Sequence, residues 1–345
     1  MLANYARVLE LSIAAVQSTR TSFDANQQNC QISLIPLIKT FVKKLSQGPP
    51  LHEKTPQEAR EIVETLQKHT PAADICQAKI DIPFDGRKVQ TVIFKPKIAQ
   101  GTLPVIFYTH GGGWILGSPT VHGSLMEDLA RQTGAAVVFP YYTPAPERQY
   151  PVQFEESYAV LQYIVEHANE LHLKTGKIAF SGDSVGVPSH MAIAMVQLAH
   201  ERKLPVDIAH LVLLYPVTDT HAKSETYKTY MNGPYLTEKT MDWMIDAFLP
   251  NVADRRNPLT SSLAFVPDEK LAKFPPTTVF VSGADPLLGE GQAFGQRLQK
   301  AGVETVILRA DGQIHDFVML EAIRHSATAR AVVELASWKI KRSLE

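Results

Sequence analysis

The sequence has few cysteines, almost no net charge and no long apolar run, and each of these shortages excludes a class of protein. Its 345 residues include 2 cysteines, Cys30 and Cys76, which lack metal-ligand or CxxC spacing and are too few for a disulfide framework. Lys+Arg 34 and Asp+Glu 35 leave a formal net charge of -1, without the basic footprint of a nucleic-acid-binding protein. We therefore expect a reducing compartment and no nucleic-acid partner.

No stretch reaches the roughly 18 uncharged apolar residues that a membrane-spanning helix needs. The N-terminus "MLANYARVLELSIAAVQSTR" lacks the basic region of a signal peptide, and Arg7 and Glu10 interrupt its apolar residues. This pattern is typical of an amphipathic helix. We therefore expect a cytoplasmic protein without a membrane span.

Apolar runs of strand length alternate with helix-length segments over most of the chain. Two alternating runs flank Asp85-Gly86, which predicts a hairpin. The later runs are short, unbroken and rich in β-branched residues, as in a mostly parallel sheet covered on both faces. They include "LPVIFYTH", "AAVVFPYY", "KIAFSG", "HLVLLYP", "TTVFVSGAD" and "ETVILRADG". The pattern predicts an α/β fold, with a terminal helix from about Phe317.

Two regions do not follow this alternation. Residues 1–75 have a helical pattern ahead of the sheet, interrupted by the helix-breaking "GPPLHEKT". Roughly sixty residues separate "LLYP" from "TTVF", which is too many for one crossover. We therefore predict a helical insertion at about 220–260, with a helix starting near Thr237, inside a main domain that spans 76–345.

The stretch Gly182-Asp183-Ser184-Val185-Gly186 matches GxSxG and lies between a strand-like run and a helix-like run. A serine hydroxyl is a poor nucleophile unless it projects from a sharp strand-to-helix turn toward a base. The glycines leave room for such a turn, and Pro188 fits the first turn of the helix, where its missing N–H needs no partner. Taken alone, this motif fits a Ser-Gly turn without chemistry equally well.

The run "YTHGGGWILGS" directly follows a predicted strand. Its three consecutive glycines, Gly111, Gly112 and Gly113, cost backbone entropy but let backbone N–H groups face a cavity, as in an oxyanion hole. A phosphate-binding loop is the rival interpretation, but no GK[ST] follows and the Rossmann spacing of glycines is absent. HGGG followed later by GxSxG is far more specific than either motif alone. We expect His110 to support this loop by hydrogen bonding.

A nucleophile of this kind needs a base and an acid, each at the end of a strand on the same edge of the sheet. Asp285 follows the run "TTVFVSGA", and His315 follows the next strand-like run. The chain order serine, aspartate, histidine is one that such triads use. Asp311 and Asp316 are rivals for the acid, but neighbours in one loop seldom orient an adjacent imidazole.

At these residues the chain resembles the hormone-sensitive-lipase-like branch of the α/β-hydrolases. The family's motifs occur in order as "HGGGW", "YYTPAPERQYPVQFEESY", "GDSVG", "ADPLLGEG" and "IHDF", from about residue 78 to the C-terminus. The resemblance implies an eight-stranded, mostly parallel sheet with a helical cap, for which residues 1–75 and the insertion at 220–260 are the natural material. It implies no metal and no organic cofactor.

The resemblance also implies a role for individual residues. Ser184 is the nucleophile, His315 the base and Asp285 its partner, while the oxyanion hole consists of the N–H groups of Gly112, Gly113 and Val185. The implied reaction is the hydrolysis of small-molecule carboxylic esters with short to medium acyl chains through an acyl-enzyme. We also expect Trp114 and Asp183 to contribute to the substrate pocket.

The chain departs from the family pattern in three places. Val185 and Val187 replace small residues, which should narrow the pocket floor or widen the spacing between helix and strand. Thr143-Pro144 replaces Arg-Leu, so a structural ion pair is expected to be missing. Gly289 stands where the family has a second acid.

Two other functions fit the same sequence. The triad would also cleave activated amides or formamides, and sequence does not separate these from esters. A ligand-binding receptor on this fold keeps the glycine loop but can lose a triad member, so the presence of all three favours catalysis. The sequence does not fix the oligomeric state, and a homodimer is compatible with it.

Overall fold

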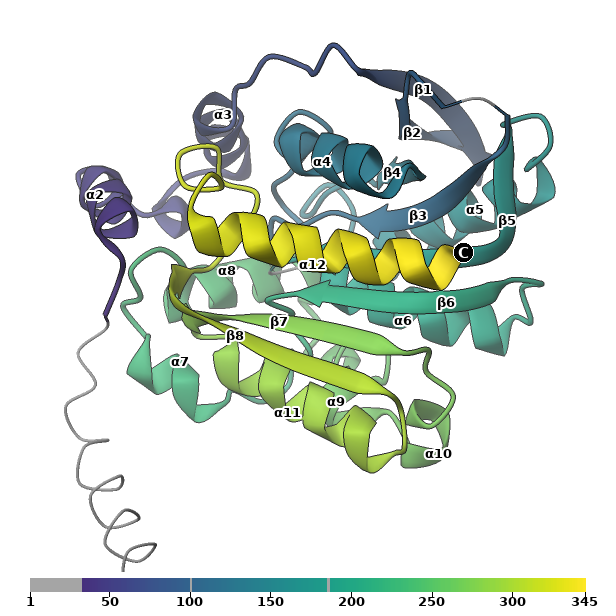
Figure 1. Cartoon of the computed structure of the whole chain (residues 1–345). Coiled ribbons are helices and arrows are strands. Elements are labelled where there is room, and N and C mark those ends of the chain that lie inside the picture. The colour runs from purple at the N-terminus through teal and green to yellow at the C-terminus, as the bar shows by residue number, and fades with distance from the viewer. Residues whose placement is uncertain (1–32, 100, 185–186) are drawn as a thin grey trace, which may run out of the picture. The chain divides into compact units, whose positions relative to one another are not determined.

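An eight-stranded sheet runs through the part of the chain that the structure describes (Figure 1). The structure is a computed structural model that describes residues 33–99, 101–184 and 187–345. The strands are β1 (Ile75–Phe84), β2 (Arg87–Pro96), β3 (Leu103–Thr109), β4 (Ala136–Tyr141), β5 (Leu173–Asp183), β6 (Asp207–Leu214), β7 (Thr277–Ala284) and β8 (Thr305–Ile314).

The sheet is mostly parallel, as predicted. Its strand order is β1-β2-β4-β3-β5-β6-β7-β8, in which β2 pairs antiparallel with β1 and β4 and all other neighbours are parallel. The predicted hairpin joins β1 to β2, since Phe84 pairs with Arg87 and leaves Asp85 and Gly86 as a two-residue turn. Both turn residues have positive φ, 46° and 68°, which matches the twist of the flanking strands.

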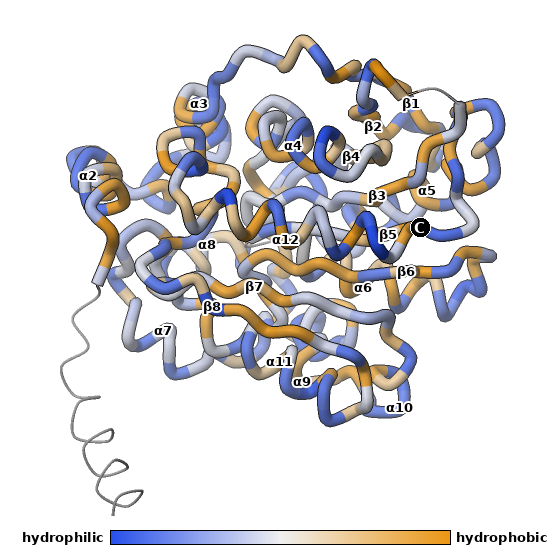
Figure 2. Tube along the Cα trace, viewed as in Figure 1, coloured by the Kyte–Doolittle hydropathy of each residue, from blue (hydrophilic) through white to orange (hydrophobic). Residues whose placement is uncertain are grey.

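Helices cover both faces of the sheet (Figure 1). On one face lie α4 (Gly123–Thr133) and α12 (Ala327–Leu344), and on the other lie α5 (Val152–Glu166), α6 (Val187–Glu201) and α11 (Leu288–Lys300). Every residue of β7 is buried as a result, and Figure 2 shows apolar residues along β6 and β7. The unbroken apolar runs of the sequence therefore correspond to strands that are buried on both faces.

Two groups of helices lie outside this layered arrangement. Before β1 come α2 (Pro36–Leu45), the short 3₁₀-helix η2 (Leu51–Glu53) and α3 (Pro56–Leu66). Between β6 and β7 come α7 (Glu225–Thr229), α8 (Glu238–Phe248), η3 (Val252–Arg255), α9 (Ser262–Phe265) and α10 (Asp268–Leu271). The two groups meet where η2 packs on α8. The amphipathic helix predicted at the N-terminus lies outside the described residues.

Local capping explains where one helix of each group begins. Thr55 and Glu58 form a capping box at the start of α3, and Pro56 occupies its first position. Thr237 caps α8 by accepting a hydrogen bond of 3.1 Å from the backbone N–H of Thr240. The helical insertion and its predicted start near Thr237 are therefore present in the structure. None of the helices in the described ranges has the length and apolar composition needed to cross a membrane.

The terminal helix begins ten residues later than predicted. It starts at Ala327, where Ser326 caps it, whereas Phe317 and the residues after it form turns. Phe317, Val318, Met319 and Leu320 are all buried, so they are apolar for a reason other than helix formation. Apolar residues in a buried loop cannot be distinguished from a helix start by periodicity alone.

The parallel strands bring three distant residues to one edge of the sheet. β5 ends at Asp183, β7 at Ala284 and β8 at Ile314. Because neighbouring parallel strands have their carboxyl ends on the same side, Ser184, Asp285 and His315 emerge from the sheet together.

Gln67, at the end of α3, ties the helices before β1 to the loop after β8. Its side-chain amide donates to the carbonyls of Val121 (3.1 Å) and Met319 (2.8 Å), and its oxygen accepts from the N–H of Glu321 (3.1 Å). The residue is 1% exposed, so loss of its side chain would leave these backbone groups without partners in a dry environment.

We expect Gln67→Leu to lower the free energy of unfolding by about 2 kcal/mol, because one buried donor and two buried carbonyls lose their partners. Denaturant unfolding monitored by circular dichroism measures this change. Gln57→Leu is the matched control, since Gln57 lies on the exposed side of the same helix and bonds only Glu61 among the described residues. Equal stability of the two variants would contradict the assignment of Gln67 as a tie.

Candidate active site

Ser184 lies at a strained turn between β5 and α6. Its φ is +67°, in the left-handed region that costs a non-glycine residue about 1–3 kcal/mol. Its backbone N–H donates to the carbonyl of Leu214 on the adjacent strand at 2.9 Å, which holds the turn against the sheet. α6 begins at Val187, so Pro188 lies in its first turn as predicted. This is the geometry of a nucleophile at a strand-to-helix turn.

The structure brings Ser184, His315 and Asp285 together in a chain of hydrogen bonds. Ser184 Oγ lies 2.5 Å from His315 Nε2, and His315 Nδ1 lies 2.6 Å from Asp285 Oδ2. All three residues are buried, with 2%, 1% and 0% exposure. An imidazole that donates from Nδ1 to a carboxylate has Nε2 available to accept the serine proton.

A hydrogen bond holds the Asp285 carboxylate in place, and an aromatic contact holds the His315 ring. Asp285 Oδ1 accepts a 2.9 Å hydrogen bond from the backbone N–H of Leu287, so both carboxylate oxygens are held. The ring of Tyr215 meets the edge of the His315 ring at 4.9 Å. Asp311, one of the rival acids, is largely exposed and pairs with Arg309 at 2.7 Å. It is therefore not in a position to orient the imidazole.

The charges around His315 favour its protonated form. Burial alone would lower its pKa, but the carboxylates of Asp285 and Asp316 raise it, and the pKa lies above its usual value of 6.5. These carboxylates thus favour transfer of the serine proton to the imidazole.

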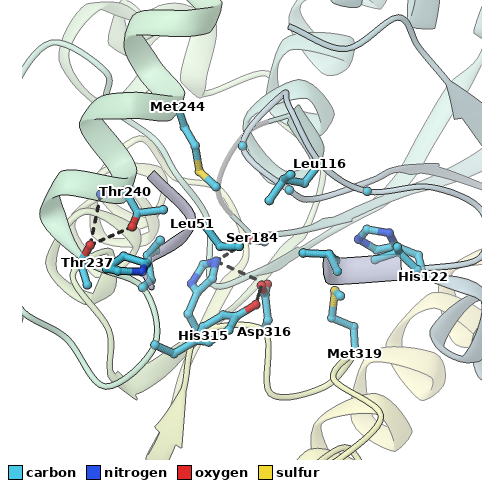
Figure 3. A pocket seen from close by; sticks show the side chains of 18 residues that line it. Leu51, Leu116, His122, Ser184, Thr237, Thr240, Met244, His315, Asp316 and Met319 are labelled. Atoms are coloured by element: carbon cyan, nitrogen blue, oxygen red, sulfur yellow. Dashed lines mark hydrogen bonds and ion pairs between the residues drawn. The ribbon is translucent and has the colours of Figure 1, made fainter. Parts of the chain in front are cut away.

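Asp316 is the rival acid that does lie in the site. Its Oδ1 is 3.4 Å from His315 Nε2, the nitrogen that faces Ser184, and Figure 3 shows its carboxylate pointing toward both residues. Burial raises the pKa of Asp316, and the neighbouring His315 offsets only part of that shift. Asp316 was predicted only as a rival to Asp285 for the orienting acid, and its position beside Nε2 was not predicted.

The backbone of the glycine loop (Gly111, Gly112 and Gly113) packs so closely on its surroundings, including Ser184, that side chains do not fit. A Cβ on Gly111 would lie 2.6 Å from Asp183 Oδ2 and 2.8 Å from Ser184 Cβ. Gly112 has φ +107°, and a Cβ there would lie 2.5 Å from the backbone of Leu116. Bulkier residues at either position would therefore displace the loop from the nucleophile.

Asp183 lies in the core and not in the substrate pocket, contrary to the prediction. Its Oδ1 accepts from the Tyr108 hydroxyl (2.6 Å) and the Gly111 N–H (3.1 Å), and its Oδ2 lies 3.3 Å from His122 Nε2. Burial alone would raise the pKa of Asp183, but His122 lowers it, so the carboxylate stays ionised. Asp183 thereby ties the glycine loop to the turn that carries Ser184.

His110 lies beneath the glycine loop. Its Nδ1 is 3.0 Å from the Gly111 carbonyl, and its ring stacks on those of Tyr142 (4.2 Å) and Phe139 (4.9 Å). Burial lowers the pKa of His110 to about 3, so the ring is neutral and can donate from Nδ1 to the carbonyl.

Trp114 also lies in the core, whereas the sequence analysis assigned it to the pocket. Its side chain is 0% exposed and stacks on Phe248 of α8, with ring centroids 4.2 Å apart. Large aromatic rings bury more area than any other side chain, so this contact anchors α8 to the glycine loop. A single apolar run gives no signal that separates a pocket wall from such an anchor.

A cavity opens directly over Ser184 and His315 (Figure 3). Its volume is about 100 Å³, which corresponds to the liquid volume of about three waters. Its walls come from the helices before β1, the glycine loop, the insertion and the loop after β8. They include Leu51, Leu116, Tyr235, Thr240, Met244 and Met319.

Contacts in the structure explain two of the departures from the family pattern, those at Thr143-Pro144 and at Gly289. Glu156 accepts hydrogen bonds from the backbone N–H (2.6 Å) and hydroxyl (2.9 Å) of Thr143, in addition to an ion pair with Arg87 at 3.7 Å. At Gly289, a Cβ would lie 2.9 Å from Ser224 Oγ, so the start of the α7 segment occupies the space of a side chain. An acid at that position would clash with it.

Val185 lies outside the described residues, as does the side chain of Val187, so their effect on the pocket floor stays a prediction. Within the described ranges, no group of three His, Cys, Asp or Glu side chains is arranged to hold a metal ion.

Comparisons with known proteins identify the family. A family model described as alpha/beta hydrolase fold matches residues 106–319, which is more than half of the chain. The chain belongs to the alpha/beta hydrolase family. This hydrolase is 46% identical over 313 residues to an esterase of Gibberella moniliformis, covering 90% of this chain and 98% of the relative. It is 47% identical over 311 residues to an esterase of Fusarium pseudograminearum, covering 90% and 95%.

A solved structure gives the same assignment. The crystal structure of a thermostable esterase from Pseudomonas putida matches this hydrolase with a TM-score of 0.87 at 30% identity, covering 92% of this chain and 99% of the other. The hydrolase is thus a carboxylesterase. The alternative of a ligand-binding receptor on the same fold finds no support among these relatives.

The raised pKa of His315 predicts the acid limb of the pH–rate profile. Only a neutral imidazole can accept the serine proton, so activity should fall as the pH decreases through this pKa. We expect the midpoint of that limb in kcat/KM to lie above about 6.5, the ordinary value for histidine. Circular dichroism across the same pH range controls for unfolding. A midpoint clearly below 6.5 would contradict the charge arrangement around Nε2 and Nδ1.

Proposed function

We propose that this carboxylesterase cleaves esters of short to medium acyl chains through Ser184, His315 and Asp285, by way of an acyl-enzyme. The observation that carries the proposal is the continuous chain of contacts, 2.5 Å from Ser184 Oγ to His315 Nε2 and 2.6 Å from Nδ1 to Asp285 Oδ2. Nucleophile, base and orienting acid within hydrogen-bond reach are the requirement for nucleophilic catalysis by a serine.

The reaction proceeds in two halves. His315 Nε2 accepts the Ser184 proton as Oγ attacks the ester carbonyl, and it then donates that proton to the departing alcohol. Water next attacks the acyl-enzyme in the same manner and releases the acid. In both halves, negative charge on the carbonyl oxygen is stabilised by the N–H groups of Gly112, Gly113 and Val185. Loss of one such donor typically costs about a hundred- to a thousand-fold in rate.

We propose further that the helices before β1 and the insertion act as a cap. Leu51 from η2 and Met244 from α8 both line the cavity above Ser184, which supports a shared role for the two groups. Residues 1–32 are not described, so the proposal concerns α2, η2 and α3. A cap formed in this way excludes water from the reacting atoms and strengthens the electrostatic interactions there.

The volume of the cavity supports the preference for short to medium acyl chains. Its roughly 100 Å³ accommodates only a few methylene groups beyond the carbonyl. Met244 limits this space further, because its Sδ would lie 2.1 Å from a Cβ on Gly113 and so packs directly on the glycine loop.

Ser184→Ala should lower esterase activity by at least about 10⁴-fold, because no other group can form the acyl-enzyme. Labelling with a fluorophosphonate probe, followed by mass spectrometry of the modified peptide, should locate the adduct on Ser184 alone. Ser181→Ala is the matched control, since Ser181 is also buried, on the strand that ends just before Ser184, but lies outside the hydrogen-bond chain. Continued labelling of the Ser184→Ala variant would refute the proposed nucleophile.

Met244→Ala should shift the acyl preference toward longer chains. Removal of three heavy atoms beside the glycine loop should raise the ratio of kcat/KM for hexanoate over acetate esters about tenfold. A panel of p-nitrophenyl esters measures the ratio, and the matching anilides test the amide alternative. Met231→Ala is the control, because Met231 lies in the same insertion but is 49% exposed. An unchanged ratio would mean that Met244 does not limit the acyl site.

A further inference from the structure

Asp316 is a buried carboxylate that the proposed triad does not use. It lines the cavity and is 8% exposed, and its Oδ1 lies 3.4 Å from His315 Nε2. Within the described part of the chain, this Oδ1 accepts no hydrogen bond of normal geometry. Its contacts are with the reacting groups, since Oδ1 forms an ion pair with His315 Nε2 and Ser184 is a hydrogen-bond partner of the Asp316 carboxylate. Burying a carboxylate is costly, so its position beside the reacting nitrogen calls for a reason.

The surroundings of Asp316 hold its carboxylate in this position. The Tyr235 hydroxyl donates to Oδ2 at 3.2 Å, which leaves Oδ1 directed at Ser184 and His315 (Figure 3). The backbone of Asp316 has φ +64°, in the left-handed region that aspartate adopts more readily than most residues.

Two oxygen nucleophiles meet at His315 Nε2 during the proposed reaction. Ser184 Oγ carries one hydrogen, so it donates to one acceptor at a time, and in the reaction that acceptor is His315. The water that attacks the acyl-enzyme carries two hydrogens, and His315 accepts only one of them. In the acyl-enzyme the Ser184 oxygen has lost its hydrogen, so it no longer offers a donor to Asp316.

We propose that Asp316 Oδ1 accepts a hydrogen bond from the second hydrogen of the attacking water and thereby positions it for deacylation. The inference rests on the proposed function, since it requires an acyl-enzyme on Ser184. The water oxygen forms a bond to the acyl carbon while one of its protons moves to His315 Nε2. The bond from the acyl carbon to Ser184 Oγ then breaks, and His315 returns its proton to Oγ. The second proton stays on the product, which leaves as the carboxylic acid.

In this role Asp316 discriminates between water and alcohols as acceptors of the acyl group. An alcohol that attacks the acyl-enzyme has one hydrogen, which His315 accepts, so Asp316 contributes nothing to its alignment. Water gains a charge-assisted hydrogen bond that an alcohol does not. The carboxylate should therefore favour hydrolysis over transfer of the acyl group to alcohols.

The test is the partition of one acyl-enzyme between water and methanol. Phenyl acetate is turned over in buffer with added methanol, and acetate and methyl acetate are quantified by NMR. Both products come from the same intermediate, so their ratio does not depend on the amount of folded enzyme or on the acylation rate. A residue with a merely structural role would leave this ratio unchanged.

We expect Asp316→Gly to raise the ratio of methyl acetate to acetate about tenfold, the usual scale of a hydrogen bond to a charged group. Glycine adopts a φ of +64° without steric cost, so this variant should fold. Asp316→Asn keeps the size and one uncharged acceptor oxygen, and should raise the ratio by a smaller factor. Asp311→Asn is the control, since Asp311 lies near the end of β8, shortly before Asp316, but is largely exposed, and it should leave the ratio unchanged.

Two results would overturn the inference. The first is a ratio of methyl acetate to acetate that matches the wild type in both Asp316 variants. The second is a rise of this ratio in Asp316→Gly alone, because such a rise would reflect the added space and not the lost carboxylate. Ser184→Ala separates this failure from failure of the proposed function. If that variant is inactive while the Asp316 ratios do not change, only the role of Asp316 is wrong. If it still forms both products, the acyl-enzyme is not on Ser184 and both proposals fail.

Discussion

The candidate site depends on a single buried carboxylate, that of Asp183. Asp183 is the last residue of β5, precedes the nucleophile in sequence, and accepts hydrogen bonds from the hydroxyl of Tyr108 and from the N–H of Gly111. His122 contacts the carboxylate from the other side; burial alone would lower the pKa of His122, but Asp183 raises it above its usual value. Because the glycine loop and the nucleophile turn belong to different strands, this ion-centred cluster fixes their separation. The tight contacts that exclude a Cβ at Gly111 follow from it.

The cavity above these residues is assembled from segments that are far apart in the sequence. Trp114 stacks on Phe248 and so joins the glycine loop to α8, and Gln67 joins the end of α3 to the loop that follows His315. Both contacts are buried, and each links a helix outside the sheet layers to a loop at the reacting edge. The size of the substrate space is therefore set by the same contacts that hold these helices in place.

The sequence predicted the sheet and the edge at which Ser184, Asp285 and His315 emerge, because unbroken apolar runs and glycine motifs follow directly from burial and close approach. It failed where different causes produce the same pattern. Trp114 is apolar as an anchor and not as a pocket wall, and Phe317 begins a buried loop and not a helix. Asp285 was correctly preferred over Asp316 as the partner of Nδ1, but the position of Asp316 beside Nε2 depends on the fold and has no signal in the sequence.

The central claim is that the serine, the imidazole and the glycine-loop amides act on one tetrahedral centre. A crystal structure of the protein inactivated by a small alkyl phosphonate tests it most directly, since the adduct mimics that centre. The account predicts a covalent bond from phosphorus to Ser184 Oγ, with the phosphoryl oxygen within hydrogen-bond distance of the Gly112 and Gly113 amides and a second oxygen beside His315 Nε2. An adduct on Ser184 whose phosphoryl oxygen points away from those amides would contradict the account, as would an adduct on another residue.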